Sequence, residues 1–332
     1  MRFYLKMIAA ATLALTLMVG AASQVQTFEQ MEGLNTPQDH GWVAPEQAFS
    51  PLKGAPAPSL KSGRGQVRLL YKDWKEATGY VYIPRHQSAP DCVGQSMAGG
   101  LDLRMAVQAV HEMYRVPQQE TDASSIYGLS RIEIAGKPAF SPGGSNVIWA
   151  MQAMSEYGAL FRKDYLYAGY NLTKYDPSRS RSWGSRGLPS VLESVAKLTP
   201  LVDYYQVSNY EEVRDAIANG YPVVVGSGVG FSRRTIFSWG QTKATRDSEG
   251  FLTEKGGWNH AMLFGGVDDR SARKGVCCMN SWGPSWVNGS TRLEQPPGSF
   301  WIDARTVTKM VSQGDAFAIV RVRAPLSYRL LK

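Results

Sequence analysis

Two different hydrophobic periodicities follow one another along the chain, and this change limits the fold more than any other feature. Between residues 91 and 220, apolar residues recur mostly at helical spacing. Beyond that point the chain carries short runs rich in β-branched and aromatic residues, at 221–226, 260–265, 275–279, 299–302 and 316–322. Helices early and strands late are typical of an α+β protein. The order predicts a helical N-terminal lobe and a β-rich C-terminal lobe.

One helix is predicted to begin at a cysteine. Asp91 can cap a helix that runs from Cys92 to about Arg115, and the following Val-Pro pair would end it. Gly99 and Gly100 weaken this helix, but they also allow another element to pack closely against it.

Other cap signals locate three more helices. Ser145 or Asn146 can begin a helix that ends at Tyr157. Capping boxes at Ser190–Glu193 and Ser208–Glu211 predict two further starts. The polar stretch 179–186, rich in Arg and Ser, is interpreted as a solvated loop.

The N-terminus has the pattern of an export signal. Two basic residues precede sixteen residues without a charge, and small residues follow near position 22. This run is short for a membrane span, which needs about 20 residues. We therefore expect a cleaved signal peptide at 1–22 and no stable membrane insertion afterwards. An uncleaved N-terminal anchor is the alternative.

The remaining chain divides by composition. Residues 23–68 are rich in Pro, Gly, Gln and Ser, which predicts a linker or surface wrap. Residues 69–325 carry the helix and strand patterns of one folded domain, and 326–332 form a short tail.

Charge and cysteine content exclude some functions. The 332-residue chain has a net charge of +8 without a block of Lys and Arg, so no nucleic-acid partner is expected. Its three cysteines are too few for a disulfide scaffold. Cys277 and Cys278 are expected on a strand; a bridge from Cys92 to one of them is the alternative. Four histidines and no paired Cys/His cluster argue against zinc, and no cofactor is predicted.

Three residues suggest nucleophilic catalysis. Cys92 lies at a helix start, where the helix dipole lowers a thiol pKa. His260 enters a predicted strand and can act as a general base. Asn280 follows the next strand, and its amide oxygen can fix the tautomer of an imidazole. Each residue alone also has an ordinary structural explanation.

Together these residues resemble the papain-like cysteine peptidases. The order Cys-His-Asn, the Asn259-His260-Ala261 run and the Asn-Ser-Trp-Gly sequence at 280–283 carry the resemblance. It implies a two-lobed α+β fold with a barrel-like C-terminal lobe and a site between the lobes. It also implies that Trp282 shelters the His-Asn contact.

The same resemblance implies roles for other residues. Gln87 and the backbone of Cys92 would form the oxyanion hole. Gly143, Gly144 and Asn259 would contact a protein or peptide substrate.

The resemblance also has departures. Gln87 lies five residues before Cys92, where the family has six, so His86 occupies the expected position. Asp91 places a carboxylate beside the thiol and would oppose its ionisation. The predicted function is an exported peptidase. A catalytically silent papain-like module and another thiol acyl-transfer enzyme, such as a transglutaminase or amidase, are the alternatives.

Overall fold

The structure is a computed structural model that describes residues 41–45, 59–112, 120–137, 143–232, 234–236 and 241–323. The predicted signal segment 1–22, the tail 326–332 and most of the linker 23–68 lie outside the described residues.

The helices are short apart from α4. They are α3 (Leu70–Thr78), α4 (Cys92–Glu112), α5 (Ala123–Gly128), the π-helical η2 (Leu129–Ile134), α6 (Val147–Glu156), the 3₁₀-helical η3 (Leu166–Ala168), α7 (Pro177–Arg186), α8 (Ser190–Ala196), α9 (Tyr210–Ala218) and α10 (Ala304–Val311).

The strands lie mostly in the second half of the chain. They are β1 (Val67–Leu69), β2 (Asp164–Tyr165), β3 (Tyr170–Asn171), β4 (Leu201–Gln206), β5 (Val223–Phe231), β6 (Arg234–Ile236), β7 (Gln241–Arg246), β8 (Glu254–Asp268), β9 (Gly275–Met279), β10 (Val287–Gly289), β11 (Ser299–Asp303) and β12 (Ala316–Val322).

One antiparallel sheet organises the strands. Its order is β11-β9-β8-β5-β12-β4, and β1 pairs with the far end of β8. β8 is the longest of the described strands, and its pairing with β5 sets His260 opposite Ser227. β10, β7 and β6 form a smaller sheet, and β2 pairs with β3.

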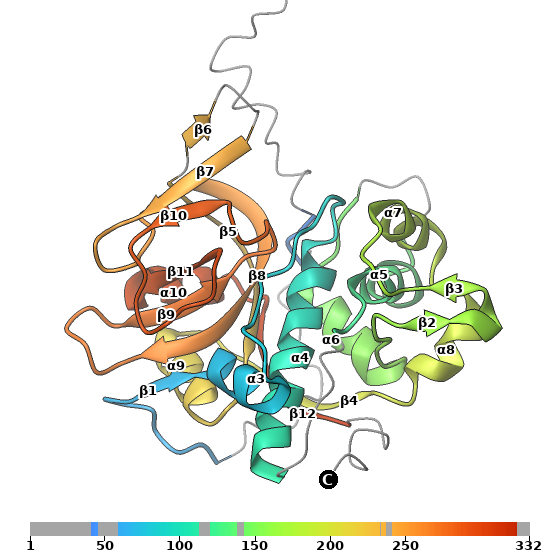
Figure 1. The fold of residues 1–332 in the computed structure, drawn as a ribbon, viewed down its shortest axis with the longest axis horizontal. Helices are drawn as coiled ribbons and strands as arrows, with labels where there is room; N and C mark the ends of the chain where they lie inside the picture. Colours follow the sequence, from blue (N-terminus) through green and yellow to red (C-terminus); the bar gives the residue numbers. More distant parts are fainter. Residues whose placement is uncertain are drawn as a thin grey trace, which may run out of the picture. The chain divides into compact units, whose positions relative to one another are not determined.

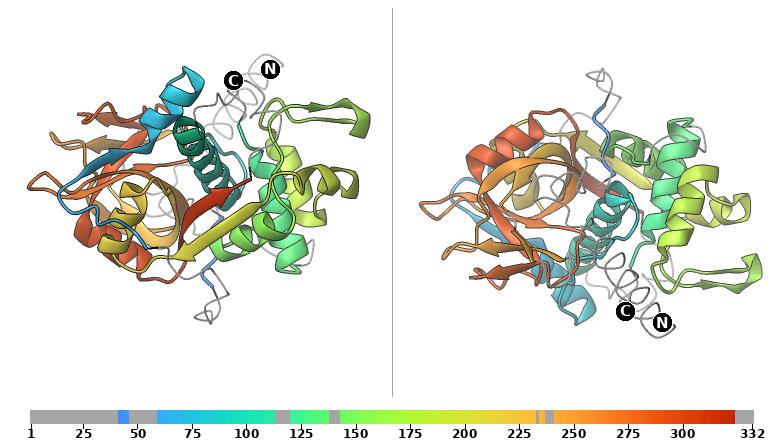
Figure 2. Two further views of the ribbon diagram at one scale, coloured as in Figure 1. Left: turned by 90° about the horizontal axis from the view of Figure 1, so that it is seen from below. Right: turned by 90° about the horizontal axis from the view of Figure 1, so that it is seen from above.

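The two lobes meet along α4. Figure 1 shows α4 between the β-rich elements around β5, β8 and β9 on one side and α5, α6 and α7 on the other. Both views in Figure 2 place this helix in the same central position. The predicted α+β architecture, with a helical and a β-rich lobe, is therefore confirmed.

Two glycines let α4 approach the sheet. A Cβ atom at Gly99 would lie 2.6 Å from the Tyr82 hydroxyl, and one at Gly100 would lie 2.7 Å from Cδ1 of Ile319. Real Cβ atoms do not approach so closely, so the glycines allow the close packing that the sequence predicts. Apolar α4 residues on several sides, including Met97, Leu101 and Leu103, are buried, as expected for a central helix.

Several predicted boundaries are confirmed. α4 begins at Cys92, although its predicted end near Arg115 lies outside the described residues. Asn146, rather than Ser145, caps α6 by accepting a hydrogen bond from the Trp149 amide. The predicted runs 275–279 and 316–322 coincide with β9 and β12.

Three local predictions are wrong. The stretch 179–186 is helical within α7, because Asp176 caps it, Pro177 starts it and Trp183 is buried. The second capping box is formed one residue later, by Asn209 and Glu212. Pro189 occupies the N-cap position of α8 and provides no side-chain cap, so Ser190 is already inside the helix.

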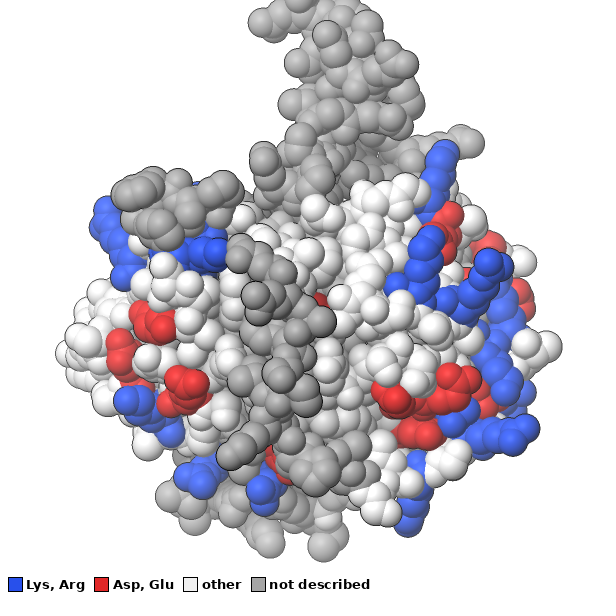
Figure 3. Space-filling view, turned by 180° about the vertical axis from the view of Figure 1, so that it is seen from behind, with Lys and Arg blue, Asp and Glu red and all other residues white. Residues whose placement is uncertain are grey.

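Charged side chains of both signs occupy the surface. In Figure 3, Lys and Arg lie mainly toward the edges of the face drawn, with Asp and Glu among them. Within the described ranges, no helix combines the length and apolar composition that a membrane span needs.

Candidate active site

Cys92 is the first residue of α4 and lies against the strand that carries His260. The Cys92 side chain is fully buried, and its Sγ accepts a hydrogen bond of 3.4 Å from the Ala261 amide. The Ser96 hydroxyl, one turn along α4, donates to the Ala261 carbonyl at 2.8 Å. These two contacts hold the thiol beside the residue that follows His260.

Burial dominates the electrostatics of the thiol. It raises the pKa of Cys92 well above the ordinary thiol value, and the charge of Asp91 raises this pKa further. The hydrogen bond from the Ala261 amide acts in the opposite direction. Burial therefore disfavours the thiolate in the conformation described.

His260 is oriented by a side-chain amide. Its Nε2 donates to Oδ1 of Asn280 at 2.7 Å, and both side chains are buried. The indole of Trp282 covers the imidazole, with ring centroids 5.0 Å apart and planes inclined by 32°. Trp258 and Trp286 pack around Trp282, so this contact lies in an aromatic cluster.

The Asp91 carboxylate is turned into a polar network. Its Oδ2 accepts hydrogen bonds from the Ser180 hydroxyl at 2.6 Å, the Tyr175 hydroxyl at 3.1 Å and Nε2 of Gln95 at 3.1 Å. These bonds lower the pKa of Asp91, but burial outweighs them and raises it to about 6. The opposing charge expected beside the thiol is therefore reduced by protonation at acidic pH.

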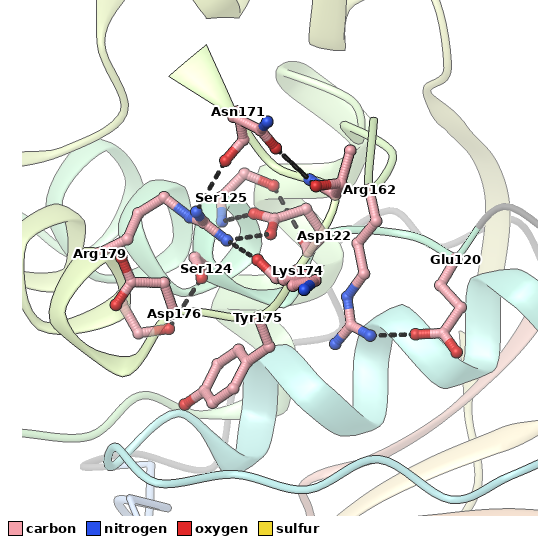
Figure 4. Close-up of polar contacts among 12 residues, drawn as sticks. Glu120, Asp122, Ser124, Ser125, Arg162, Asn171, Lys174, Tyr175, Asp176 and Arg179 are labelled. Atoms are coloured by element: carbon pink, nitrogen blue, oxygen red, sulfur yellow. Dashed lines mark hydrogen bonds and ion pairs between the residues drawn. The ribbon is translucent and has the colours of Figure 1, made fainter. Parts of the chain in front are cut away.

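A set of ion pairs supports the segment that supplies Tyr175. Figure 4 shows Arg179 of α7 reaching Asp122 and the carbonyls of Asn171 and Lys174. Arg162 pairs with Glu120 in the same region. The bonds from Arg179 hold the loop before α7, from which Tyr175 reaches Asp91.

Gln87 lies beside the loop that contains Asn280. Its backbone amide donates to the Ser281 carbonyl at 2.8 Å. In its side chain, Oε1 accepts from the Ser281 hydroxyl at 2.5 Å, and Nε2 donates to the Ala89 carbonyl at 3.1 Å. His86, the other residue considered for this position, is exposed and lies against Gly283.

The backbone of Gly144 is already occupied. The Gly144 amide donates to the Tyr127 hydroxyl at 2.9 Å, and the Gly144 carbonyl accepts from Arg131 at 2.8 Å. Ser145, one residue later, instead directs its amide and carbonyl to Gly41 and Val43. Gly143 is exposed, and a Cβ atom there would lie 2.7 Å from Pro90.

Two solved structures with a similar fold are described as cysteine proteases. Xylellain, a cysteine protease from Xylella fastidiosa, matches 85% of this chain and 97% of its own with a TM-score of 0.53 and 16% identity. Procathepsin B S9 from Trypanosoma congolense matches 88% of this chain and 89% of its own with a TM-score of 0.52 and 13% identity. The chain has a papain-like fold. Scans of protein-family models and of curated proteins gave no match.

The three cysteines are not joined by a disulfide. All are free and buried, so the alternative of a bridge from Cys92 to Cys277 or Cys278 is wrong. The two neighbouring cysteines lie on β9, as the sequence predicts, and Sγ of Cys278 contacts Sδ of Met262 at 3.6 Å. Among the described residues, no group of His, Cys, Asp and Glu is arranged to hold a metal ion.

The sequence analysis missed Trp42 and Asp315, which lie near this site. Trp42, in the expected linker, is 5% exposed, and its indole N–H donates to Oδ2 of Asp315 at 2.7 Å. Asn259, immediately before His260, accepts a hydrogen bond from the Trp42 amide at 3.3 Å. A lone tryptophan within a polar segment was the available signal for Trp42. Nothing local marked Asp315, which directly precedes β12.

Proposed function

We propose that this protein is an exported cysteine-type peptidase that hydrolyses peptide bonds through Cys92, His260 and Asn280. The supporting observation is the hydrogen bond that His260 donates to Asn280. Ala261, which follows His260 on β8, donates its backbone amide to the Cys92 thiol. The fold shared with cysteine proteases supports the same reaction class. Export rests on the signal pattern at 1–22.

The reaction begins with proton transfer from Cys92 to His260. The thiolate sulfur then bonds to the carbonyl carbon of the substrate amide, and the carbonyl oxygen takes up the negative charge. When the tetrahedral intermediate collapses, the C–N bond breaks and His260 gives its proton to the leaving amine. Water, deprotonated by His260, attacks the thioester, and the sulfur departs as the carboxylic acid product forms.

Neighbouring groups have separate tasks in this scheme. The Cys92 amide and Nε2 of Gln87 stabilise the oxyanion, and each such donor typically contributes about 3 kcal/mol in the transition state. Asn280 holds the imidazole in one tautomer, and Trp282 keeps water from their hydrogen bond. The N-terminal end of α4 favours the thiolate once substrate binding has displaced the groups that bury it.

Substitution of individual cysteines tests this proposal. Cys92→Ala should abolish hydrolysis of a denatured protein substrate, whereas Cys278→Ala, which removes another fully buried thiol, should retain it. Circular dichroism would verify that both variants are folded. Wild-type turnover by Cys92→Ala would refute the assignment.

The high pKa of the buried thiol favours a second candidate, a catalytically silent binding module. Site-resolved alkylation separates the two functions. A peptidase should show selective modification of Cys92 at about pH 5.5 that is lost in His260→Ala, because an ordinary thiol, with a pKa near 8.5, is protonated there. Equal, slow modification of the three cysteines would favour the silent module.

A further inference from the structure

A short N-terminal segment lies across the junction between the two lobes. The Val43 amide donates to the Ser145 carbonyl at 2.8 Å, and the Ser145 amide donates to the Gly41 carbonyl at 2.9 Å. On the other side, the Trp42 amide donates to the Asn259 carbonyl at 3.3 Å. Ser145 precedes α6 in the helical lobe, and Asn259 precedes His260 in the β-rich lobe. Residues 41–43 are thus held by main-chain bonds from both lobes.

The same segment passes next to the start of α4. Gly41 has a φ of +85°, and a Cβ atom there would lie 2.0 Å from the Pro90 carbonyl oxygen. Pro90 is two residues before Cys92. The close approach requires glycine at position 41 and places the backbone of the segment against Pro90, close in sequence to the candidate nucleophile.

Side chains of the segment alternate between the interior and the surface. Val43 is exposed, whereas Trp42 is buried, as expected for an extended chain bound on one face. Main-chain pairing combined with a pocket for alternate side chains is a general mode of peptide recognition. The segment therefore has the contacts of a bound peptide, although it belongs to the same chain.

The Trp42 pocket is formed by Asp315, Gly226 and the first residues of α6. Oδ2 of Asp315 accepts from the indole N–H and from the Val147 amide at 2.8 Å, while Oδ1 accepts from the Ile148 amide at 3.0 Å. A Cβ atom at Gly226 would lie 1.9 Å from Nε1 of Trp42. The indole thus fills the space in front of Gly226, and the Asp315 carboxylate accepts a hydrogen bond from the indole N–H.

We propose that the Trp42 pocket is a substrate side-chain pocket, that Asp315 makes it select a large aromatic side chain with an N–H donor, and that residues 41–43 occupy it as an internal ligand. This proposal rests on the proposed peptidase function, because only a peptidase would take a peptide into this pocket as a substrate. The segment must leave before a peptide can bind. Asp315 determines specificity because a side chain without a donor leaves one of its buried acceptor positions unpaired.

Peptide binding tests the pocket without any need for catalysis. The full chain carrying Cys92→Ala and Trp42→Ala is titrated with acetyl-Gly-Trp-Val-amide by isothermal titration calorimetry. We expect at least tenfold tighter binding than to the chain carrying Cys92→Ala alone, because the internal ligand has lost its anchor. The matched control adds Val43→Ala instead, which shortens an exposed side chain of the same segment, and should bind no better than Cys92→Ala alone.

A second peptide tests the role of Asp315. Acetyl-Gly-Phe-Val-amide keeps an aromatic ring but lacks the indole N–H, and should bind about tenfold more weakly than the Trp peptide. Equal binding of the two peptides would overturn the specificity role of Asp315. Failure of the folded Trp42→Ala protein to bind either peptide would overturn the pocket and leave Trp42 as a core residue.

A milder variant covers the case in which Trp42→Ala does not fold. Trp42→Phe keeps most of the packing and removes the donor to Asp315, so the Trp peptide should again bind more tightly than it does to Cys92→Ala alone. The outcomes also separate the two proposals. Peptide binding without hydrolysis by the chain with Cys92 intact would retain the pocket and reject the peptidase. Hydrolysis of a protein substrate without binding of either peptide would retain the peptidase and reject the pocket.

Discussion

Nε2 of His260 and Oδ1 of Asn280 lie 2.7 Å apart beneath the indole of Trp282. His260 belongs to β8, and Asn280 directly follows β9, which pairs with β8. The pairing of β8 with β9 therefore brings the imidazole and its acceptor together. This relationship leads directly to a kinetic prediction.

Asn280→Ala should lower kcat for peptide hydrolysis by about 100-fold, because the imidazole loses the acceptor that fixes its tautomer and orientation. Steady-state kinetics with a peptide substrate would measure the change. Asn288→Ala, at an exposed position on β10, is the matched control and should retain kcat. Equal kcat values for Asn280→Ala and wild type would remove Asn280 from the reaction.

Asp91 should control the ionisation of the neighbouring thiol. Its negative charge raises the pKa of Cys92, so Asp91→Asn should lower this pKa and accelerate alkylation by about tenfold, the effect of one pKa unit. The pKa of Asp91 is about 6, so the two proteins should differ above pH 6 and converge below it. Rates measured from pH 5 to 9 by peptide mass spectrometry would show the difference. Parallel profiles across this range would contradict the prediction.

The same carboxylate should make stability depend on pH. Burial raises the pKa of Asp91 from 3.8 to about 6, so between these values the folded state binds more protons than the unfolded state. The free energy of unfolding should therefore fall as pH rises through this window. Asp91→Asn should reduce the fall by about 3 kcal/mol, the product of this shift and 1.36 kcal/mol per pKa unit. Urea unfolding of both proteins at pH 4 and pH 7 would measure this difference. An equal loss of unfolding free energy between these pH values in wild type and Asp91→Asn would disprove the prediction.

Local sequence patterns predicted the parts of the site that lie on regular elements. The predicted cap at Asp91 located the start of α4, although the Asp91 carboxylate bonds to the side chains of Ser180, Tyr175 and Gln95 instead. The apolar runs located β9 and β12. The spacing from His260 to Asn280 then suggested a pair that the sheet does bring together. These features depend on residues close in sequence or on the pairing of two neighbouring strands, so a short sequence motif is enough to predict them.

Features that depend on distant segments could not be predicted. The hydrogen bond from Trp42 to Asp315 joins residues 273 positions apart, and composition assigned Trp42 to a linker. The segment 179–186 has weak helix formers, but the burial of Trp183 and the Asp176 cap override propensity. The backbone contacts of Gly144 with Tyr127 and Arg131, and those of Ser145 with the N-terminal segment, also join distant parts of the chain.

Gly226→Ala provides a test of the N-terminal segment from the opposite side of the Trp42 pocket. The added Cβ would lie 1.9 Å from Nε1 of Trp42 and 2.7 Å from Oδ2 of Asp315, so the indole has to leave its position. Residues 41–43 should then exchange their amide hydrogens faster, because the Trp42 and Val43 amides lose the carbonyls that accept from them.

Hydrogen exchange read by mass spectrometry on a peptide that contains Trp42 and Val43 would measure this release. Gly228→Ala is the matched control on the same strand, because its Cβ would make only ordinary contacts, 3.6 Å from Gln313 and 3.8 Å from Asn259. Its exchange in the 41–43 segment should equal that of the wild type. The enlarged residue at 226 also narrows the pocket, so acetyl-Gly-Trp-Val-amide should not bind to Gly226→Ala despite the released segment. Slow exchange in Gly226→Ala, with Trp42 still buried, would show that the pocket accommodates the methyl group and that the segment is a fixed part of the core.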